Sequence, residues 1–512
     1  MTLKKKAIRG SALLTGSEAI VYGASFVRNM LLARLLAKAD FGIAATFSMV
    51  VMLLEFSQRL GISRFVVRDK EGAQPEFIAA AHLVQFVAGT LSAVLLAAAA
   101  WPLSGLFGLQ EQRWAMIALA LIPLLRSVEH LDVRRFEREL RFGPSALIEM
   151  VPQVIITLAA WPMAVWLKDY RAVLVLLIGK TVMSCLGSHY LSERPYELKL
   201  HPEYVKRMLR FGWPLVVNGF LMFGVLHGDQ FLVASFYTMS ELGSYAAAAT
   251  LTMAPTFFFG KVFNSVMLPV MAGAQDSPAE FQRRYSQSLA VISLFSVVCV
   301  VGLSIGSEAI MRFVYGAKYV GSGILMTWLA AANAFRNLRI APALAAIAKG
   351  DSENQMISNF WRVGALLPAL FAALVHKPLW VIACTGIFGE LLACTASFAR
   401  LTRRDRIPFR VSAFPIACVA ALTAAAVGLH FGLGSAISGP LSLVISGFSA
   451  AIAGLILVFL LPVLRAEVTT QWAAISRKGF RARLKEISLS LRPVRKATPS
   501  VPAPAPSLQT QR

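Results

Sequence analysis

Charged residues are scarce in this 512-residue sequence, and so are cysteines. Only 15% of the residues are Asp, Glu, Lys or Arg, against about 25% in soluble proteins, while 57% are hydrophobic. The mean hydropathy of +0.63 excludes an ordinary soluble domain. The five cysteines all fall in apolar runs without Cys-x-x-Cys spacing, which argues against a disulfide scaffold or a metal site. We therefore expect no metal and no cofactor.

Acidic residues are the scarcer kind of charge. The sequence has 27 Asp and Glu against 50 Lys and Arg, a formal net charge of +23. Such an excess could serve nucleic-acid binding, but the basic residues sit in short loops between apolar runs and in the C-terminal tail. That distribution is typical of membrane topology and of attraction to anionic lipids. We expect membrane lipids, and no nucleic acid, among the partners.

Long apolar runs are abundant, and fourteen of them have about the length that crosses a bilayer. With the N-terminus placed in the cytoplasm, most Lys and Arg residues fall on the cytoplasmic side, and seven fall in the segments predicted outside. We expect an all-α polytopic membrane protein with both termini in the cytoplasm. The predicted spans are residues 8–36, 41–60, 77–101, 114–129, 144–167, 172–191, 211–236, 243–270, 286–305, 321–347, 357–376, 379–399, 412–431 and 441–464.

A weak internal repeat is visible at a shift of 201 residues. The shift aligns residues 40–42 (Asp-Phe-Gly) with residues 241–243 (Glu-Leu-Gly). Both copies would begin inside the cell, as parallel repeats do, although chance similarity between apolar helices is the alternative. The repeat predicts six-helix lobes at residues 1–207 and 208–402, two additional transmembrane helices at 403–464, and a basic amphipathic and disordered cytoplasmic tail at 465–512.

Ionisable residues within the spans point to a function. Each costs about 2.5–3.5 kcal/mol if it faces lipid at mid-membrane, so these residues should face protein or a water-filled cavity. The cations outnumber the acids, nine to six, and a cavity with surplus positive charge suits an anionic head group. The cations are Arg28, Arg34, Arg59, Arg126, Lys180, Lys261, Arg336, Arg339 and Arg362, and the acids are Glu18, Glu55, Glu129, Glu149, Asp229 and Glu390.

Six of the cations, Arg59 among them, are candidates for binding substrate in the cavity. Arg28 lies about two-thirds along its span, too deep for its side chain to reach the membrane surface easily. Arg336 and Arg339, three residues apart, either line the cavity or form a structural seam. Lys261 is a further candidate. Arg34 lies near the outer end of its span and could equally be an interfacial anchor.

Acidic and amide side chains complete the candidate site. Asp229 either pairs with a buried cation such as Arg28 or binds a coupling cation. Asn218 lies eleven residues before Asp229, on nearly the same helix face. Glu55 and Arg59 are four residues apart, so they either neutralise each other or both line the cavity.

Two segments resemble bacterial oligosaccharide flippases, the polysaccharide-transport branch of a superfamily that also contains multidrug exporters and lipid II flippases. One comprises residues 26–36 (Phe-Val-Arg-Asn-Met-Leu-Leu-Ala-Arg-Leu-Leu) with 40–42 and Gly61. The other comprises residues 211–214 (Phe-Gly-Trp-Pro), Asp229 and residues 242–245 (Leu-Gly-Ser-Tyr). Trp213 and His227 depart from the family pattern.

The resemblance implies transport across the bacterial inner membrane. Such flippases move undecaprenyl-pyrophosphate-linked oligosaccharides from the cytoplasmic to the periplasmic leaflet by alternating access. The products serve exopolysaccharide, capsule or O-antigen synthesis. The expected partners are thus a lipid-linked anionic oligosaccharide and, downstream, a polysaccharide polymerase and export machinery.

Three alternatives stay open. A lipid II flippase would also bind a pyrophosphate. A drug/cation antiporter needs carboxylates in its cavity, and the nine-to-six excess of cations argues against it. A glycan-processing membrane enzyme is disfavoured, because the sequence shows no sizeable polar loop and no cluster of acid/base residues. We expect a protein that is not an enzyme.

Overall fold

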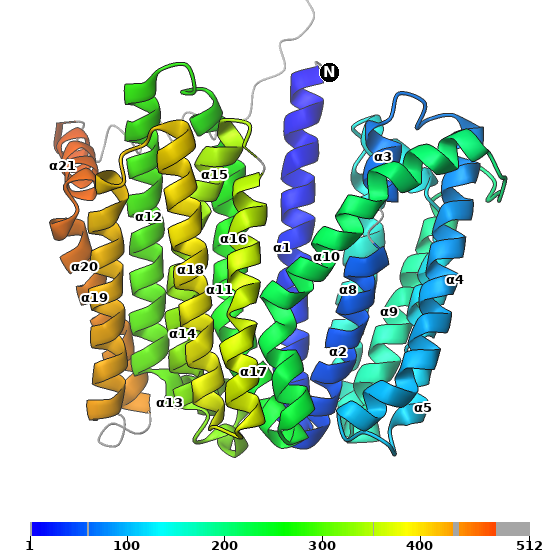
Figure 1. Cartoon of the computed structure of the whole chain (residues 1–512), viewed down its shortest axis with the longest axis horizontal. Helices are drawn as coiled ribbons and strands as arrows, with labels where there is room; N and C mark the ends of the chain where they lie inside the picture. The colour runs from blue at the N-terminus through cyan, green and yellow to red at the C-terminus, as the bar shows by residue number, and fades with distance from the viewer. Residues whose placement is uncertain (1–2, 59–60, 352, 434–439, 478–512) are drawn as a thin grey trace, which may run out of the picture.

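The structure, a computed structural model, describes residues 3–58, 61–351, 353–433 and 440–477. In these residues every regular element is a helix, and the long helices run roughly along one direction in two groups (Figure 1). The helices are α1 (Leu3–Leu35), α2 (Lys38–Gln58), α3 (Ile62–Arg68), α4 (Pro75–Leu106), α5 (Arg113–Ala118), α6 (Leu121–Ser127), α7 (Asp132–Arg138), α8 (Gly143–Leu167), α9 (Arg171–Tyr190), α10 (Pro202–Phe236), α11 (Met239–Ala272), α12 (Pro278–Ile305), α13 (Ser307–Tyr315), η1 (Ala317–Tyr319), α14 (Gly323–Leu338), α15 (Ile340–Ala348), α16 (Glu353–Gly364), α17 (Leu366–Leu374), α18 (Leu379–Asp405), α19 (Arg410–Leu433), α20 (Pro440–Leu460) and α21 (Pro462–Arg477).

The all-α membrane fold is confirmed, but the number of fourteen spans is not. Within the described residues, ten helices are long and apolar enough to cross a membrane, or eleven if the bent pair Arg113–Ser127 and Asp132–Arg138 is one span. The predicted span 321–347 corresponds to α14 and α15, which are 16 and 9 residues long and are separated at Arg339. Arg336 and Arg339 interrupt the apolar run there, because their side chains must be paired inside the protein.

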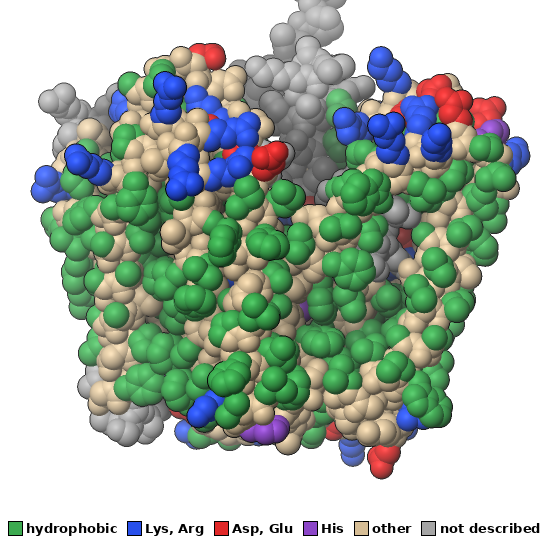
Figure 2. All heavy atoms as spheres, in the orientation of Figure 1, with side chains coloured by type: hydrophobic (Ala, Val, Ile, Leu, Met, Phe, Trp, Pro, Cys, Tyr) green, Lys and Arg blue, Asp and Glu red, His purple; other side chains and the backbone are tan. Residues whose placement is uncertain are grey.

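The outer surface has the apolar middle that lipid contact requires. Hydrophobic side chains cover the middle of the visible face, while charged side chains gather at its upper and lower edges (Figure 2). Large apolar side chains such as Leu158 and Phe371 are more than two-thirds exposed. Exposed apolar area on this scale marks a membrane surface. We call the end where α1 and α8 begin the basic end, and the end where α1 stops and α2 begins the closed end.

Helix α10 connects the two groups, of which the first comprises α1 to α9 and the second α11 to α21. Its first turns pack against α3 and α4 through Met208 and Phe211, and its later turns contact α2, α16 and α17. It therefore runs obliquely across the molecule, in green in Figure 1. Pro214 lies inside α10. Proline is tolerated in membrane helices because neighbouring helices can satisfy the freed carbonyl group.

Apolar packing joins the two groups at the closed end. One buried cluster contains Leu36 and Phe47 from the first group together with Leu242, Tyr245 and Tyr315 from the second. Two further clusters hold α3 to α4 near the basic end and α12 to its neighbours α14, α19 and α20. The boundaries at residues 207 and 402 stay a prediction.

Candidate functional site

A cavity of about 1010 Å³ lies between the two groups of helices. Residues of α1 to α4 and α6 to α8 line one side of it, and residues of α10 and α16 line the other. Twelve of the twenty lining side chains are polar or charged. Ligand pockets for drug-sized molecules measure about 300–1,000 Å³ and are mostly apolar. The cavity is thus large and unusually polar.

The cavity is acidic, which corrects the expectation of surplus positive charge. Five glutamates and two arginines line it, a formal charge of −3. The count of nine cations and six acids over all spans did not predict this, because many of the cations lie elsewhere in the protein. The glutamates are Glu18, Glu55, Glu129, Glu137 and Glu149, and the arginines are Arg126 and Arg134.

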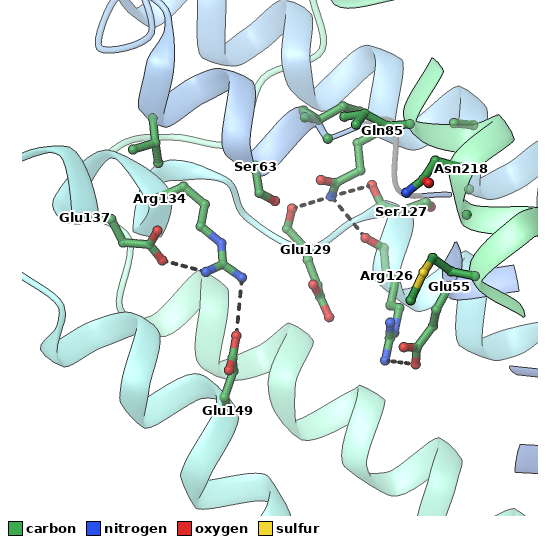
Figure 3. Close-up of a pocket in the computed structure, with 18 of the residues that line it drawn as sticks. Glu55, Ser63, Gln85, Arg126, Ser127, Glu129, Arg134, Glu137, Glu149 and Asn218 are labelled. Atoms are coloured by element: carbon green, nitrogen blue, oxygen red, sulfur yellow. Dashed lines mark hydrogen bonds and ion pairs between the residues drawn. The ribbon is translucent and has the colours of Figure 1, made fainter. Parts of the chain in front are cut away.

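Both cavity arginines have carboxylate partners (Figure 3). Arg126 NH2 lies 2.7 Å from Glu55 Oε1, which joins α6 to α2. Arg134 NH1 lies 2.5 Å from Glu137 Oε1 on the next turn of α7. The predicted partner of Glu55, Arg59, lies outside the described residues. Glu55 therefore finds its cation on a neighbouring helix, which helix spacing alone cannot show.

The break between α6 and α7 places Glu129 at the cavity. Gln85 Nε2 on α4 donates towards the carbonyl oxygens of Arg126, Ser127 and Glu129, at 3.0, 3.4 and 2.8 Å. The helix stops at Ser127, so its last carbonyls are short of regular helical partners, and the amide group of Gln85 supplements them. The Arg126 carbonyl also accepts from the backbone N–H of Glu129 at 3.2 Å. Close packing supports the arrangement, since a Cβ on Gly89 would lie 2.3 Å from Ser127 Cβ.

Besides Glu55, one predicted site residue, Asn218, lines the cavity, and another, Lys261, lies beside it. Asn218 lines it from α10, in the same region as Met222. Lys261 on α11 forms an ion pair with Glu18 on α1, and Glu18 lines the cavity. The Lys261 ammonium group also lies 5.3 Å from the centre of the Tyr22 ring. This pair connects the two groups of helices beside the cavity.

Arg28 and Arg34 lie further from the basic end. Arg34 is exposed, and its NH1 donates to the Phe313 carbonyl at 3.2 Å, so it connects α1 to α13 at the closed end. Arg28 is half-buried and donates to Asn29 Oδ1 at 3.2 Å. No carboxylate in the described part of the chain forms an ion pair with Arg28. Neither arginine lines the cavity.

Lys180 is a neighbour of Arg28 that the sequence interpretation missed. It lies half-buried in α9, close enough to experience the positive charges of Arg28 and Arg126. Among the described residues no carboxylate forms an ion pair with it. A signal was present in the sequence, since Lys180 lies near the middle of a predicted span, where an uncompensated charge is costly.

Arg336 and Arg339 belong to a buried ionic cluster in the second group of helices. The Glu390 carboxylate, which is fully buried, lies 2.7 Å from Arg336 Nε and 3.6 Å from Arg339 NH2. Arg362 Nε lies 2.9 Å from the same Oε1 atom as Arg336. Arg339 also donates to the Ser358 hydroxyl at 2.9 Å. Glu390 and Arg362 therefore complete a network that joins α14, α16 and α18.

Asp229 lies in a second, much smaller pocket of about 20 Å³, lined also by Arg336 and Arg362. The Tyr245 hydroxyl donates to Asp229 Oδ2 at 2.9 Å, which joins α10 to α11. Asp229 and Asn218 line different pockets, although they share α10. Asp229 forms no ion pair with Arg28 in the described part of the chain.

The fold is that of the multidrug/oligosaccharidyl-lipid/polysaccharide transporters. The structure is similar to "Lipid II flippase MurJ, inward closed conformation", with a TM-score of 0.68 and 13% sequence identity over 88% of this chain and 98% of that one. It is also similar to an inward-facing multidrug resistance MATE transporter of the MOP superfamily. The TM-score of that comparison is 0.58, with 14% sequence identity over 77% of this chain and 94% of the transporter. At such identities these likenesses show the fold alone.

Sequence similarity gives the family. Residues 31–323 match the family described as "Polysaccharide biosynthesis protein", and the chain belongs to it, which confirms the resemblance to oligosaccharide flippases. The chain is 22% identical over 331 residues to the lipopolysaccharide biosynthesis protein WzxC of Escherichia coli (strain K12), over 62% of this chain and 65% of that protein. It is 22% identical over 338 residues to the teichuronic acid biosynthesis protein TuaB of Bacillus subtilis (strain 168), which covers 63% of this chain and 68% of TuaB. The match thus spans slightly less than two-thirds of WzxC.

Proposed function

We propose that this protein is a flippase for an undecaprenyl-pyrophosphate-linked oligosaccharide of exopolysaccharide, capsule or O-antigen synthesis. The observation that supports this most strongly is the polar cavity of about 1010 Å³ inside a bundle with an apolar outer surface. A hydrated chamber beside lipid gives sugars a path across the membrane while the lipid tail stays in the bilayer. The names of the similar proteins WzxC and TuaB, both of polymer biosynthesis, point the same way.

The charge distribution supports an orientation for this transport. By the positive-inside rule the basic end would lie in the cytoplasm, and the proposal puts the protein in the inner membrane. The cavity residues Glu55 and Glu149 lie near the basic-end termini of α2 and α8, whereas the apolar cluster around Phe47 joins the helices at the closed end. This conformation would therefore accept substrate from the cytoplasm. Rocking the two groups of helices would then expose the cavity to the periplasm, where polymerase and export machinery take the product.

Arg28 and Lys180 are the proposed head-group site. Both lack an ion-pair partner in the described part of the chain, and each is a half-buried cation. Arg28 lies ten residues beyond Glu18 along α1, about 15 Å nearer the closed end. A pyrophosphate moving inward from the cavity would meet these two cations, and charge-assisted hydrogen bonds would hold it there. Arg336 and Arg339 act in this proposal as structural partners of Glu390.

A drug/cation antiporter is the second candidate, because five glutamates line the cavity. A carboxylate-rich cavity can exchange protons against organic cations. However, the described lining residues include no Phe, Tyr or Trp, and aromatic faces are the usual means of holding organic cations. A lipid II flippase is the third candidate, because lipid II is a pyrophosphate-linked cargo of the same chemical class.

Reconstitution in liposomes tests the proposal. A fluorescent undecaprenyl-pyrophosphate disaccharide is incorporated in both leaflets, and a membrane-impermeant quencher reports the fraction that reaches the outer leaflet. The protein should make all of the lipid accessible, and ethidium uptake into the same liposomes should stay at background. Uptake of ethidium without movement of the glycolipid would establish the antiporter instead.

A further inference from the structure

Among the described residues of the cavity wall, no cation is free to bind an anionic sugar. Its two arginines, Arg126 and Arg134, are both within 2.7 Å of a glutamate oxygen. Its other charges are carboxylates, so a carboxylate on the substrate would be surrounded by like charge. Juxtaposed like charges repel each other, and water in the cavity weakens this repulsion without removing it. The charges of the cavity wall therefore disfavour sugars that carry a carboxylate.

Glu129 is the carboxylate best placed to touch a substrate. Figure 3 shows its side chain extending into the space between Arg126 and Arg134. No Lys or Arg in the described residues lies within ion-pair distance of it, in contrast to Glu18, Glu55, Glu137 and Glu149. Gln85 fixes the backbone of Glu129 through the bond of 2.8 Å to its carbonyl, so the position of the carboxylate is defined by the break between α6 and α7.

A carboxylate is an acceptor only, with two oxygens and about four lone-pair positions. It pairs with groups that donate, which on a sugar are hydroxyl, amide N–H and ammonium groups. The other uncharged polar side chains of the wall, among them Ser63, Asn218 and Gln355, can donate or accept. Because no aromatic ring lines the described wall, hydrogen bonds rather than stacking must supply recognition.

We infer that this cavity selects a glycan without carboxylate groups, made of neutral or amine-bearing sugars, and that Glu129 is a specificity-determining residue. The inference rests on the proposed function, because it concerns the sugar part of the same substrate. The pyrophosphate part is compatible with it, since Arg28 and Lys180 lie nearer the closed end than the glutamates. The substrate would then lie with its anionic end towards the two cations and its sugars beside the acidic wall.

The test uses the full chain in lipid nanodiscs and three synthetic glycolipids with one undecaprenyl-pyrophosphate anchor. The probes differ only in the terminal sugar of a disaccharide, which is a hexose, an amino hexose with a free amine, or a uronic acid. We expect the uronate probe to bind at least about tenfold more weakly than the hexose probe, a difference of about 1.4 kcal/mol. The amine probe should bind at least as tightly as the hexose probe.

Variants connect this selectivity to Glu129. Glu129→Gln keeps the size of the side chain and removes its charge. In this variant the uronate penalty, which is the ratio of the Kd of the uronate probe to the Kd of the hexose probe, should fall to less than about threefold. Glu129→Asp keeps the charge and should preserve the penalty, which separates a specificity role from a folding role. Glu111→Gln is the matched control, because Glu111 is exposed in the loop between α4 and α5 and does not line the cavity.

The outcomes are distinguishable. Equal or tighter binding of the uronate probe would overturn the inference and leave the proposed function intact. An unchanged uronate penalty in Glu129→Gln would overturn the role of Glu129. If none of the three glycolipids binds, or none moves in liposomes, the proposed function itself is wrong and the inference fails with it.

Discussion

Gly42 in α2 and Gly243 in α11 meet backbone to backbone at the closed end. A Cβ on Gly42 would lie 1.9 Å from the Met239 carbonyl oxygen, and a Cβ on Gly243 would lie 2.2 Å from that of Lys38. The contacts are reciprocal, each glycine facing the first turn of the other helix. The capping box of Thr238 fixes where α11 begins and therefore where Gly243 lies. Only glycine allows the two helices to approach this closely.

Replacing Gly42 by alanine should open the closed end. The added methyl group cannot avoid a backbone atom, and overpacking of this kind costs about 1–3 kcal/mol. We expect Gly42→Ala to lower the melting temperature in detergent by several degrees and Gly243→Ala to do the same. Gly179→Ala is the matched control, because a Cβ there meets nothing within 4 Å. If all three variants have the same melting temperature, the contact between the two glycines contributes nothing to closure.

Neutralising Glu390 should unfold the second group of helices. The variant Glu390→Gln leaves Arg336, Arg339 and Arg362 buried without a counter-charge, and breaking a buried ion pair costs about 3–5 kcal/mol. The expected result is low abundance in membranes and early thermal unfolding. Glu353→Gln should lose less than about 1 kcal/mol, since its pair with Arg400 is at the surface. Normal stability of Glu390→Gln would show that the cluster is dispensable.

Acid should weaken the attachment of the loop between α15 and α16 to α18. Asp351 accepts from Arg400 Nε at 2.7 Å and from Arg404 NH1 at 3.2 Å, and these bonds, with the Arg400 bond dominant, hold the pKa of the Asp351 carboxyl below its ordinary 3.8. The ionised carboxylate therefore stabilises the fold above pH 3.8, and this stabilisation is lost as the pH falls through the lowered pKa.

The measurement is the difference in melting temperature between the wild type and Asp351→Asn. That difference should be largest near neutral pH and should shrink as the pH falls below about 4. A difference that stays constant down to about pH 2 would mean that ionisation of Asp351 does not stabilise the fold.

The sequence predicts the helices better than it predicts their charges. Apolar runs gave the all-α membrane fold, because each run had to be long enough to cross lipid. The span at 321–347 was continuous in the sequence prediction and is broken at Arg339 in the structure. A hydropathy pattern counts the two arginines only as a local cost of burial, whereas in the structure both pair with Glu390 on α18.

Pairing between helices was the part that the sequence did not reveal. Arg126 pairs with Glu55, which is 71 positions away in sequence, so no helical spacing indicates the pair. Counting charges over all spans then predicted a cationic cavity, while the described wall is acidic. Arg28 was singled out because it lies deep in its span, and its role in binding stays a prediction. Lys180 comes from α9, so placing it in the same region as Arg28 depends on tertiary packing.

Removing the two deep cations should stop transport without unfolding the protein. Arg28→Gln and Lys180→Gln each delete one charge-assisted hydrogen-bond donor, worth about 1.5–3 kcal/mol, so each should slow glycolipid movement by at least about tenfold. Arg312→Gln is the control, because Arg312 is exposed on α13. Wild-type rates in both variants, at normal abundance, would remove Arg28 and Lys180 from the head-group site.

The fate of lipid-linked oligosaccharide in cells depleted of this protein tests transport most directly. Undecaprenyl-linked glycans are extracted after intact cells have been treated with a glycan-modifying enzyme that reaches only the periplasm. A flippase defect predicts accumulation of glycolipid that the enzyme cannot reach, together with loss of surface polysaccharide, and rescue by the wild type but not by Arg28→Gln/Lys180→Gln. No accumulation and unchanged surface polysaccharide would contradict the proposed function.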